Sequence, residues 1–385
     1  MTPDLTPDPT SVEDLLRDLV RIPSVNPRDG AADGGETAVA EYVRDWLERR
    51  GVRAELPEVL PGRRNVVAVV PGRAPGVVLL ESHLDTVETD GMTVDPYDGA
   101  VHDGRLYGRG ACDAKGPLAA FLLALAELAA GDGPPPYTVV LAGVCDEEHG
   151  CLGVLHLVDA LTDRPVVGAI VGEPTGLVPA VAHKGVVRYT VRTRGRAGHS
   201  SRPEEAVNAI TLMAPVIAHL AGSPPAVPPH PLLGSATRSV TRVRGGTGPN
   251  TIPDSCEVDV DRRTLPGEDP ETVWEHDRAE LTALGAEVDS PFTVDPALDT
   301  AADADVVTAL RRALDEHGRP SEIRGMPFGT DASKLARAEI PSVVFGPGSV
   351  ADAHSAEESV DLAEVELAAR VVAAAVRGLG EPSCD

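Results

Sequence analysis

The chain has 385 residues, of which 42% are hydrophobic and 24% are charged, and its formal net charge is −26. This length suits about two or three domains with a sizeable core, and the negative charge argues against binding to nucleic acid or to an acidic membrane surface. No apolar run reaches the roughly 18 residues of a membrane span, and the acidic, proline-rich amino terminus is unlike a signal peptide. The five cysteines contain no CxxC pair, which fits reduced thiols. We therefore expect a cytoplasmic enzyme with no nucleic-acid or membrane partner.

Helical apolar spacing and short continuous apolar runs alternate through the amino-terminal part of the chain. They predict, in chain order, helices over 11–19 and 37–50, strands over 64–70 and 78–83, a helix over 117–130, a strand over 137–144, a helix over 152–161 and a strand over 166–171. Strands that are apolar throughout are typical of a parallel sheet buried on both faces.

Carboxylates and histidines follow the ends of these apolar runs. Because the carboxyl ends of parallel strands lie at one edge of an open α/β sheet, side chains placed there can meet. The residues concerned are His83 and Asp85, Asp146-Glu147-Glu148, Glu173, Asp113 in its glycine-flanked loop, and His354 after the last apolar run. Such a set of imidazoles and carboxylates predicts a metal site.

The spacing within two of these motifs indicates different roles. His83 and Asp85 are two residues apart, so in extended backbone they point the same way, and Asp85 can accept a hydrogen bond from the non-ligating ring nitrogen of His83. Glu147 and Glu148 are adjacent and point in different directions. One of them can bind metal while the other acts as general base.

The pattern changes after residue 180. A strand over 187–193, a helix over 204–220, strands over 239–243 and 256–261, and a helix over 270–284 predict an α+β unit whose antiparallel sheet is covered on one side by helices. After the inserted unit the sequence again predicts alternating helices and strands. They are a helix over 301–316, a helix opened by residues 329–331, a strand over 342–345 and a helix over 362–376. We therefore expect a catalytic domain made of 1–180 and 295–385, interrupted by an inserted domain over 181–294.

The combined motifs are similar to those of a known family. The segments ESHLDTV, YGRGACDAKG, CDEEHGCLGV, GEPT, GRAGHSSRPEEAVNAI, GPNTIP, DRRTLPG, GTD and FGPGSVADAHSAEES, in this order, resemble the M20 metallopeptidases, in the branch of acetylornithine deacetylase and succinyl-diaminopimelate desuccinylase. The resemblance runs from about residue 15 to 376. It implies an α/β fold: a discontinuous zinc-hydrolase domain with a mixed, mostly parallel sheet, plus an inserted α+β lid and dimerisation domain.

The resemblance also implies a metal centre. Two Zn²⁺ ions are expected, with Co²⁺ or Mn²⁺ as working substitutes; His83 and Glu173 would hold one, Glu148 and His354 the other, and Asp113 would bridge them. A cis peptide bond is implied after Asp113. Glu147 matches the general base, and Asp85 matches the residue behind the first histidine.

Further residues are implied to meet the substrate. His199 and Asn250 match residues that polarise the scissile carbonyl from the other subunit of a homodimer. Arg263, Gly329 and Thr330 match positions that bind the substrate carboxylate. His149, His183 and Lys184 have no assigned role.

The activity that the resemblance implies is removal of an N-acyl group, with acetyl favoured, from a small amino acid such as N2-acetyl-ornithine. Succinyl-diaminopimelate desuccinylase, general aminoacylase and dipeptidase remain alternatives, since the sequence names neither the acyl group nor the amino acid. A catalytically silent relative that binds metal or ligand is an alternative of a different class. Silent relatives usually lose a ligand or the base, and here Glu147 and all five expected ligands are present.

Overall fold

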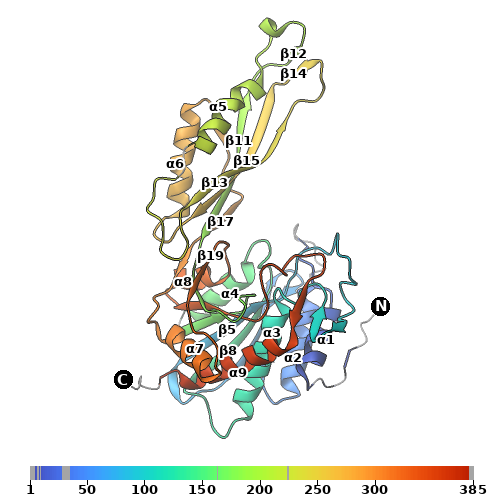
Figure 1. The fold of residues 1–385 in the computed structure, drawn as a ribbon, viewed down its shortest axis with the longest axis vertical. Coiled ribbons are helices and arrows are strands. Elements are labelled where there is room, and N and C mark those ends of the chain that lie inside the picture. Colours follow the sequence, from blue (N-terminus) through green and yellow to red (C-terminus); the bar gives the residue numbers. More distant parts are fainter. Residues whose placement is uncertain are drawn as a thin grey trace. The chain divides into compact units, whose positions relative to one another are not determined.

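A computed structural model describes residues 5–6, 8, 10–27, 35–162, 164–222 and 225–380 (Figure 1). The chain divides into two compact units. The discontinuous unit comprises Met1–Val181, Thr300–Arg324 and Thr330–Asp385, and the inserted unit comprises Ala182–Asp299 and Gly325–Gly329. The first stretch of the inserted unit ends at Asp299, whereas the sequence predicts an end at residue 294. β17 (Thr293–Asp295), which spans the predicted boundary, still pairs with β11 (Gly185–Arg194) inside the inserted unit.

The discontinuous unit is built on a mixed sheet. Its strands lie in the order β1 (Ala54–Glu55), β4 (Val66–Val70), β8 (Tyr137–Val144), β5 (Ala74–His83), β9 (Val166–Val171), β20 (Ser342–Val344) and β10 (Ala180–His183). The four central strands, from β8 to β20, are parallel to one another, and the flanking strands are antiparallel. This is the mixed, mostly parallel sheet that the sequence predicts.

Helices cover both faces of this sheet. One core cluster joins one sheet face to α1 (Val12–Arg21), α2 (Glu36–Glu48), α3 (Lys115–Ala130), α7 (Asp305–Glu316) and α9 (Leu362–Gly378). On the other face, α4 (Leu152–Leu161) packs against β8 and against α8 (Ala332–Arg337). No helix in the described ranges is both long and apolar enough to cross a membrane.

Short strands shape the loops at the ends of the sheet. β2 (Glu58–Leu60) and β3 (Arg63–Arg64) form a hairpin before β4. A small antiparallel sheet joins β6 (Val101–His102), β7 (Arg105–Tyr107) and β21 (Ser359–Asp361). It ties the segment before α3 to the segment before α9.

The inserted unit has an antiparallel sheet in the order β13 (Thr237–Gly245), β15 (Ser255–Thr264), β11 and β16 (Glu287–Val288), with β17 also on β11. Alternate residues of β11 and β15 are buried, and they share a core with α5 (Ala209–Gly222) and α6 (Pro270–Ala283), which cover one face (Figure 1). β12 (Gly198–His199) pairs with β14 (Thr251–Ile252), and β18 (Leu298–Asp299) and β19 (Arg324–Met326) pair with β10.

Two predicted helices begin later than expected. The helix expected over 204–220 begins at Ala209, because Pro203–Glu205 forms a separate 3-10 turn and Val207 exchanges two backbone hydrogen bonds with Arg196. Asn208 then caps the helix, its side-chain oxygen accepting the N–H of Ile210 at 2.9 Å. The helix expected over 301–316 begins at Asp305.

Candidate active site

Three neighbouring parallel strands deliver the candidate ligands to one edge of the sheet. β5 ends at His83, which lies beside Val144 at the end of β8. The chain continues from β8 into the Glu147 and Glu148 pair, and from β9 into Glu173. The shared direction of the strands is therefore the reason that residues far apart in sequence meet here.

The five candidate ligands form two triads that share Asp113. His83, Asp113 and Glu173 make one triad, and Asp113, Glu148 and His354 make the other, with the potential ligand atoms of each triad within 4.8 Å of one another. The Nε2 atom of His83 lies 3.0 Å from Asp113 Oδ1, and the Nε2 atom of His354 lies 3.3 Å from Asp113 Oδ2 and 3.1 Å from Glu148 Oε1. Atoms that bind one zinc ion at about 2.0–2.2 Å lie at comparable separations. Mixed imidazole and carboxylate donors fit two divalent cations.

The electrostatics of the cluster suit cation binding. Hydrogen bonds to Asp113 and Glu148 raise the pKa of His354 to about 10. Burial raises the pKa of Glu173 well above its usual range, and the charge of Asp113 adds to this effect. Carboxylates crowded in a buried place need positive charge nearby, and protons or cations can supply it.

The loop that carries Asp113 is held from behind by a residue that sequence reasoning missed. Glu358 is fully buried and accepts the backbone N–H groups of Cys112 and Asp113, both at 3.0 Å. Its other oxygen lies 2.5 Å from Arg109 Nη1. The peptide bond between Asp113 and Ala114 is cis, as the resemblance implies. In the sequence Glu358 is only the second of two adjacent glutamates in the segment FGPGSVADAHSAEES, and no local pattern separates it from Glu357.

Asp85 contacts His83 differently from the sequence expectation. The Nδ1 atom of His83 lies 3.0 Å from the backbone oxygen of Asp85 and 3.6 Å from its carboxylate. The carboxylate instead accepts the N–H groups of Glu147 at 3.1 Å and Glu148 at 3.0 Å, and the side-chain amide of Asn26 at 2.7 Å. The nearest acceptor for the imidazole is therefore a backbone carbonyl, because the carboxylate is occupied by the next loop.

Glu147 lies outside both triads. Its carboxylate groups with Cys151 and Asp331. Burial raises the pKa of Glu147 well above its usual range. Glu81 and Asp331 are both buried, and the carboxylate of Glu81 has no hydrogen-bond partner among the described residues. Lys334 Nζ lies 4.0 Å from an Asp331 carboxylate oxygen. Both Glu81 and Asp331 lie in motifs that carry the family resemblance, ESHLDTV and GTD, but neither is a predicted site residue.

The remaining predicted residues lie in or next to the inserted unit. His199 is exposed, and the N–H of Ser201 donates to its Nδ1 at 3.2 Å, so the neutral ring carries its proton on Nε2. The pairing of β12 with β14 brings His199 close to Asn250. The guanidinium of Arg263 donates to the carboxylate of Asp261, at 2.8 and 3.2 Å. Thr330 is only 1% exposed.

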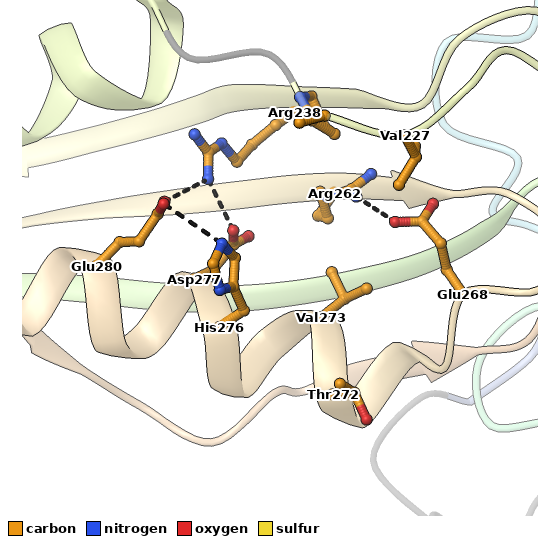
Figure 2. Close-up of a pocket in the computed structure, with 11 residues that line it drawn as sticks. Val227, Arg238, Arg262, Glu268, Thr272, Val273, His276, Asp277 and Glu280 are labelled. Carbon is orange, nitrogen blue, oxygen red and sulfur yellow. Dashed lines mark hydrogen bonds and ion pairs between the residues drawn. The ribbon is translucent and has the colours of Figure 1, made fainter.

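The inserted unit also has a cavity of about 360 Å³ between β13, β15 and α6 (Figure 2). Ion pairs line it, including Arg238 with Asp277 at 2.7 Å and Arg262 with Glu268 at 2.6 Å. None of the predicted site residues borders this cavity.

Two triads joined by one carboxylate at the strand ends of an α/β sheet, with the half-buried Glu147 beside them, are the arrangement expected of a metallohydrolase. The model of peptidase family M20/M25/M40 matches residues 79–378. The chain belongs to this family.

Relatives of the chain are similar over nearly its whole length. It is 31% identical to the acetylornithine deacetylase of Proteus mirabilis, over 93% of this chain and 94% of that protein. It is also 31% identical to the acetylornithine deacetylase of Vibrio vulnificus, over 94% of this chain and 97% of that protein.

Solved structures share the fold. The M20 family metallo-carboxypeptidase Sso-CP2 from Sulfolobus solfataricus matches with a TM-score of 0.79 at 19% identity, covering 94% of this chain and 97% of that one. The Bacillus subtilis YXEP protein, a dinuclear metal-binding peptidase from the M20 family, matches with a TM-score of 0.72 at 21% identity, covering 96% of this chain and 97% of that one.

Proposed function

We propose that this protein is a metal-dependent amidohydrolase that removes an N-acyl group, with acetyl favoured, from a small amino acid such as N2-acetyl-ornithine. The observation that carries the proposal is the pair of triads sharing Asp113, with Glu147 next to them but part of neither. The acetylornithine deacetylases that are 31% identical to the chain support the choice of the acetyl group.

The donor set fits two divalent cations, which we propose to be Zn²⁺, with Co²⁺ or Mn²⁺ as substitutes. His83 and Glu173 would hold one, Glu148 and His354 the other, and Asp113 both. Such cations, when bound, polarise a carbonyl group and lower the pKa of water. The dinuclear metal binding of the similar Bacillus subtilis peptidase supports two ions rather than one.

Glu147 would move the proton. Its backbone N–H is held by Asp85, so the residue is fixed in place while its carboxylate stays free of both triads. It would take a proton from the attacking water and deliver it to the nitrogen of the leaving amine. The raised pKa of this carboxyl supports both halves of that role, because the group can hold the proton between the two steps.

His199 and Asn250 would meet the acyl oxygen of the substrate. The Nε2–H of His199 is a donor that no described residue accepts, and such a donor can stabilise negative charge on an oxygen. By family resemblance we assign these two residues to the partner's site in a homodimer. β13 forms an open edge of the inserted unit's sheet, with Val243 61% exposed, and such an edge can be covered by a second copy.

The substrate's free carboxylate would bind Arg263, Gly329 and Thr330. Arg263 already donates to Asp261 through two of its nitrogens, so a substrate carboxylate would share the guanidinium. Thr330 is buried, and its side-chain oxygen accepts the N–H of Ala332.

A panel of N-acetyl, N-succinyl and dipeptide substrates, assayed with zinc or cobalt present, tests the proposal. We expect the highest kcat/KM with an N-acetyl amino acid. Faster turnover of succinyl-diaminopimelate, of long acyl groups or of dipeptides would instead indicate the desuccinylase, aminoacylase or dipeptidase alternatives. No turnover in a protein that binds metal would indicate a catalytically silent relative.

A further inference from the structure

The loop from Cys145 to Gly153 carries both the candidate base Glu147 and the candidate ligand Glu148. It begins where β8 ends and closes in the first turn of α4. Its two ends meet at a neck, where the N–H of Gly153 donates to the backbone oxygen of Cys145 at 3.1 Å. A Cβ on residue 153 would lie 2.2 Å from that oxygen, so the neck can close this tightly only with glycine.

Asn65 completes the neck. Its side-chain amide donates to the backbone oxygen of Gly153 at 2.9 Å and accepts the N–H of Cys145 at 3.0 Å. Asn65 lies between β3 and β4, it is fully buried, and its own N–H donates to Pro57. One amide side chain therefore satisfies a donor and an acceptor from opposite ends of the loop, as a neighbouring strand would.

The middle of the loop is held separately. Asp146 adopts a positive φ of 71° and lies 3.0 Å from Arg63, which also pairs with the buried Glu36. The carboxylate of Asp85 accepts the N–H groups of Glu147 and Glu148. The ends and the middle are thus held by different side chains, and Asn65 bonds to both ends.

We propose that Asn65 is a positioning residue for Glu147. It touches neither triad in the structure; it acts by closing the neck, which sets where the carboxylate of Glu147 lies relative to the ligands. This inference rests on the proposed role of Glu147. Without the amide, the N–H of Cys145 and the carbonyl of Gly153 each lose a buried hydrogen bond, and the neck can open. A displacement of about 1 Å at a reacting group can lower a rate by roughly 10²-fold.

Two variants and one control test the role. Asn65→Asp keeps the size and the acceptor for Cys145 but turns an oxygen toward the backbone oxygen of Gly153; Asn65→Ala removes both bonds. Thr300→Val is the matched control: the buried Thr300 hydroxyl likewise donates to Ser342 O at 2.6 Å and accepts its N–H at 3.4 Å. That contact lies at the start of β20, the strand end opposite the candidate ligands.

Turnover is measured at saturating zinc or cobalt. We expect both Asn65 variants to lose about 10- to 100-fold in kcat with KM little changed, while Thr300→Val loses thermal stability but keeps kcat. A kcat loss in Asn65→Ala no larger than that in Thr300→Val would overturn the proposal.

Hydrogen exchange of the metal-loaded protein, followed by mass spectrometry, measures how readily the loop opens and does not depend on turnover. Peptides covering residues 145–153 should exchange faster in both Asn65 variants than in the parent, and should be unchanged in Thr300→Val. Unchanged exchange in the Asn65 variants would refute the positioning role. If the parent turns over no N-acyl substrate, the proposed function fails, yet the exchange result still decides for or against Asn65.

Discussion

Asp113 presents its two carboxylate oxygens to two different histidines: Oδ1 lies 3.0 Å from His83 Nε2, and Oδ2 lies 3.3 Å from His354 Nε2. One side chain therefore belongs to both triads, and a change there affects both. Glu147 and Glu148, by contrast, are two neighbouring side chains with separate positions. They are adjacent in sequence, but only Glu148 belongs to a triad.

This difference predicts separable effects of two neighbouring substitutions. Glu147→Ala should lower kcat by at least about 10²–10⁴-fold, the value of a general base, while the protein keeps its metal. Glu148→Ala should lose both activity and one metal ion, because it removes a ligand. Metal analysis by mass spectrometry alongside steady-state kinetics checks both. Loss of metal in Glu147→Ala, or near-normal turnover, would show that its role is misassigned.

Metal binding should depend on pH. Hydrogen bonds to Asp113 and Glu148 raise the pKa of His354 from 6.5 to about 10, so the metal-free ring is protonated at neutral pH. A cation must displace that proton. We expect zinc affinity to rise as pH increases toward about 10, and zinc binding near neutral pH to release protons. Calorimetric titration in buffers of different ionisation enthalpy measures the release, and heats that do not depend on the buffer would contradict it.

The same shift affects the stability of the metal-free fold. Because the folded pKa of His354 is raised, its contribution to the free energy of unfolding is fully present below 6.5 and is lost as pH rises through about 10. Urea denaturation of the metal-free protein across that range should show this loss. A His354→Ala variant, which lacks the titrating group, should show a smaller one.

At the scale of elements, the loop before α3 depends on Glu358. This glutamate accepts two backbone N–H groups of the loop and pairs with Arg109, and both side chains are at most 3% exposed. Glu358→Gln would leave the buried guanidinium without its counter-charge. We expect a loss of about 3–5 kcal/mol in unfolding free energy, measured by denaturant titration, together with weaker metal binding.

The neighbouring glutamate gives a control. Glu357 is exposed, and its carboxylate accepts a hydrogen bond from the hydroxyl of Thr93 at 3.2 Å. Glu357→Gln should therefore change stability by no more than about 0.5 kcal/mol. Equal effects of the two substitutions would show that burial of Glu358 is not what matters.

Elements with a strong apolar pattern were predicted well from the sequence. β8, β9 and α4 have the predicted bounds, because a continuous apolar run or a helical period records burial directly. The predicted start of α5 was wrong. The bridge between Val207 and Arg196 ends before the helix can begin, and this partner lies in a segment that no local pattern shows; Asn208 then caps the helix.

The candidate ligands could be named from the sequence, and the groups that hold them could not. His83 and Glu173 follow apolar strands and fall in recognisable motifs. Asn65 and Glu358 act through hydrogen bonds to backbone groups of loops far away in sequence, and Asn26 donates to the carboxylate of Asp85. Any polar side chain at the right point in space can do this, so the interaction leaves no spacing rule in the sequence.

At the scale of the whole molecule, the proposed homodimer predicts complementation. Glu147 belongs to the discontinuous unit and His199 to the inserted unit. If His199 serves the partner's site, a mixture of the inactive variants Glu147→Ala and His199→Ala should regain activity under conditions that allow subunits to exchange. One site of each heterodimer then combines an intact Glu147 with an intact His199.

Exchange itself must be shown, for example by energy transfer between labelled subunits. The expected recovery is at most one active site in each mixed dimer. Full exchange without any recovery would mean that His199 acts within its own chain, or that it takes no part in the reaction.

The position of β20 has a consequence for synthesis on the ribosome. β20 is the parallel neighbour of β9, yet the whole stretch Ala182–Asp299 of the inserted unit is translated between them. At a synthesis rate of roughly 5–20 residues per second, the edge of β9 stays unpaired for on the order of ten seconds or more before β20 is made. An unpaired apolar strand edge is prone to pair with other chains. The nascent protein must therefore protect this edge, by early folding of the inserted unit or by a chaperone, until Ser342 emerges.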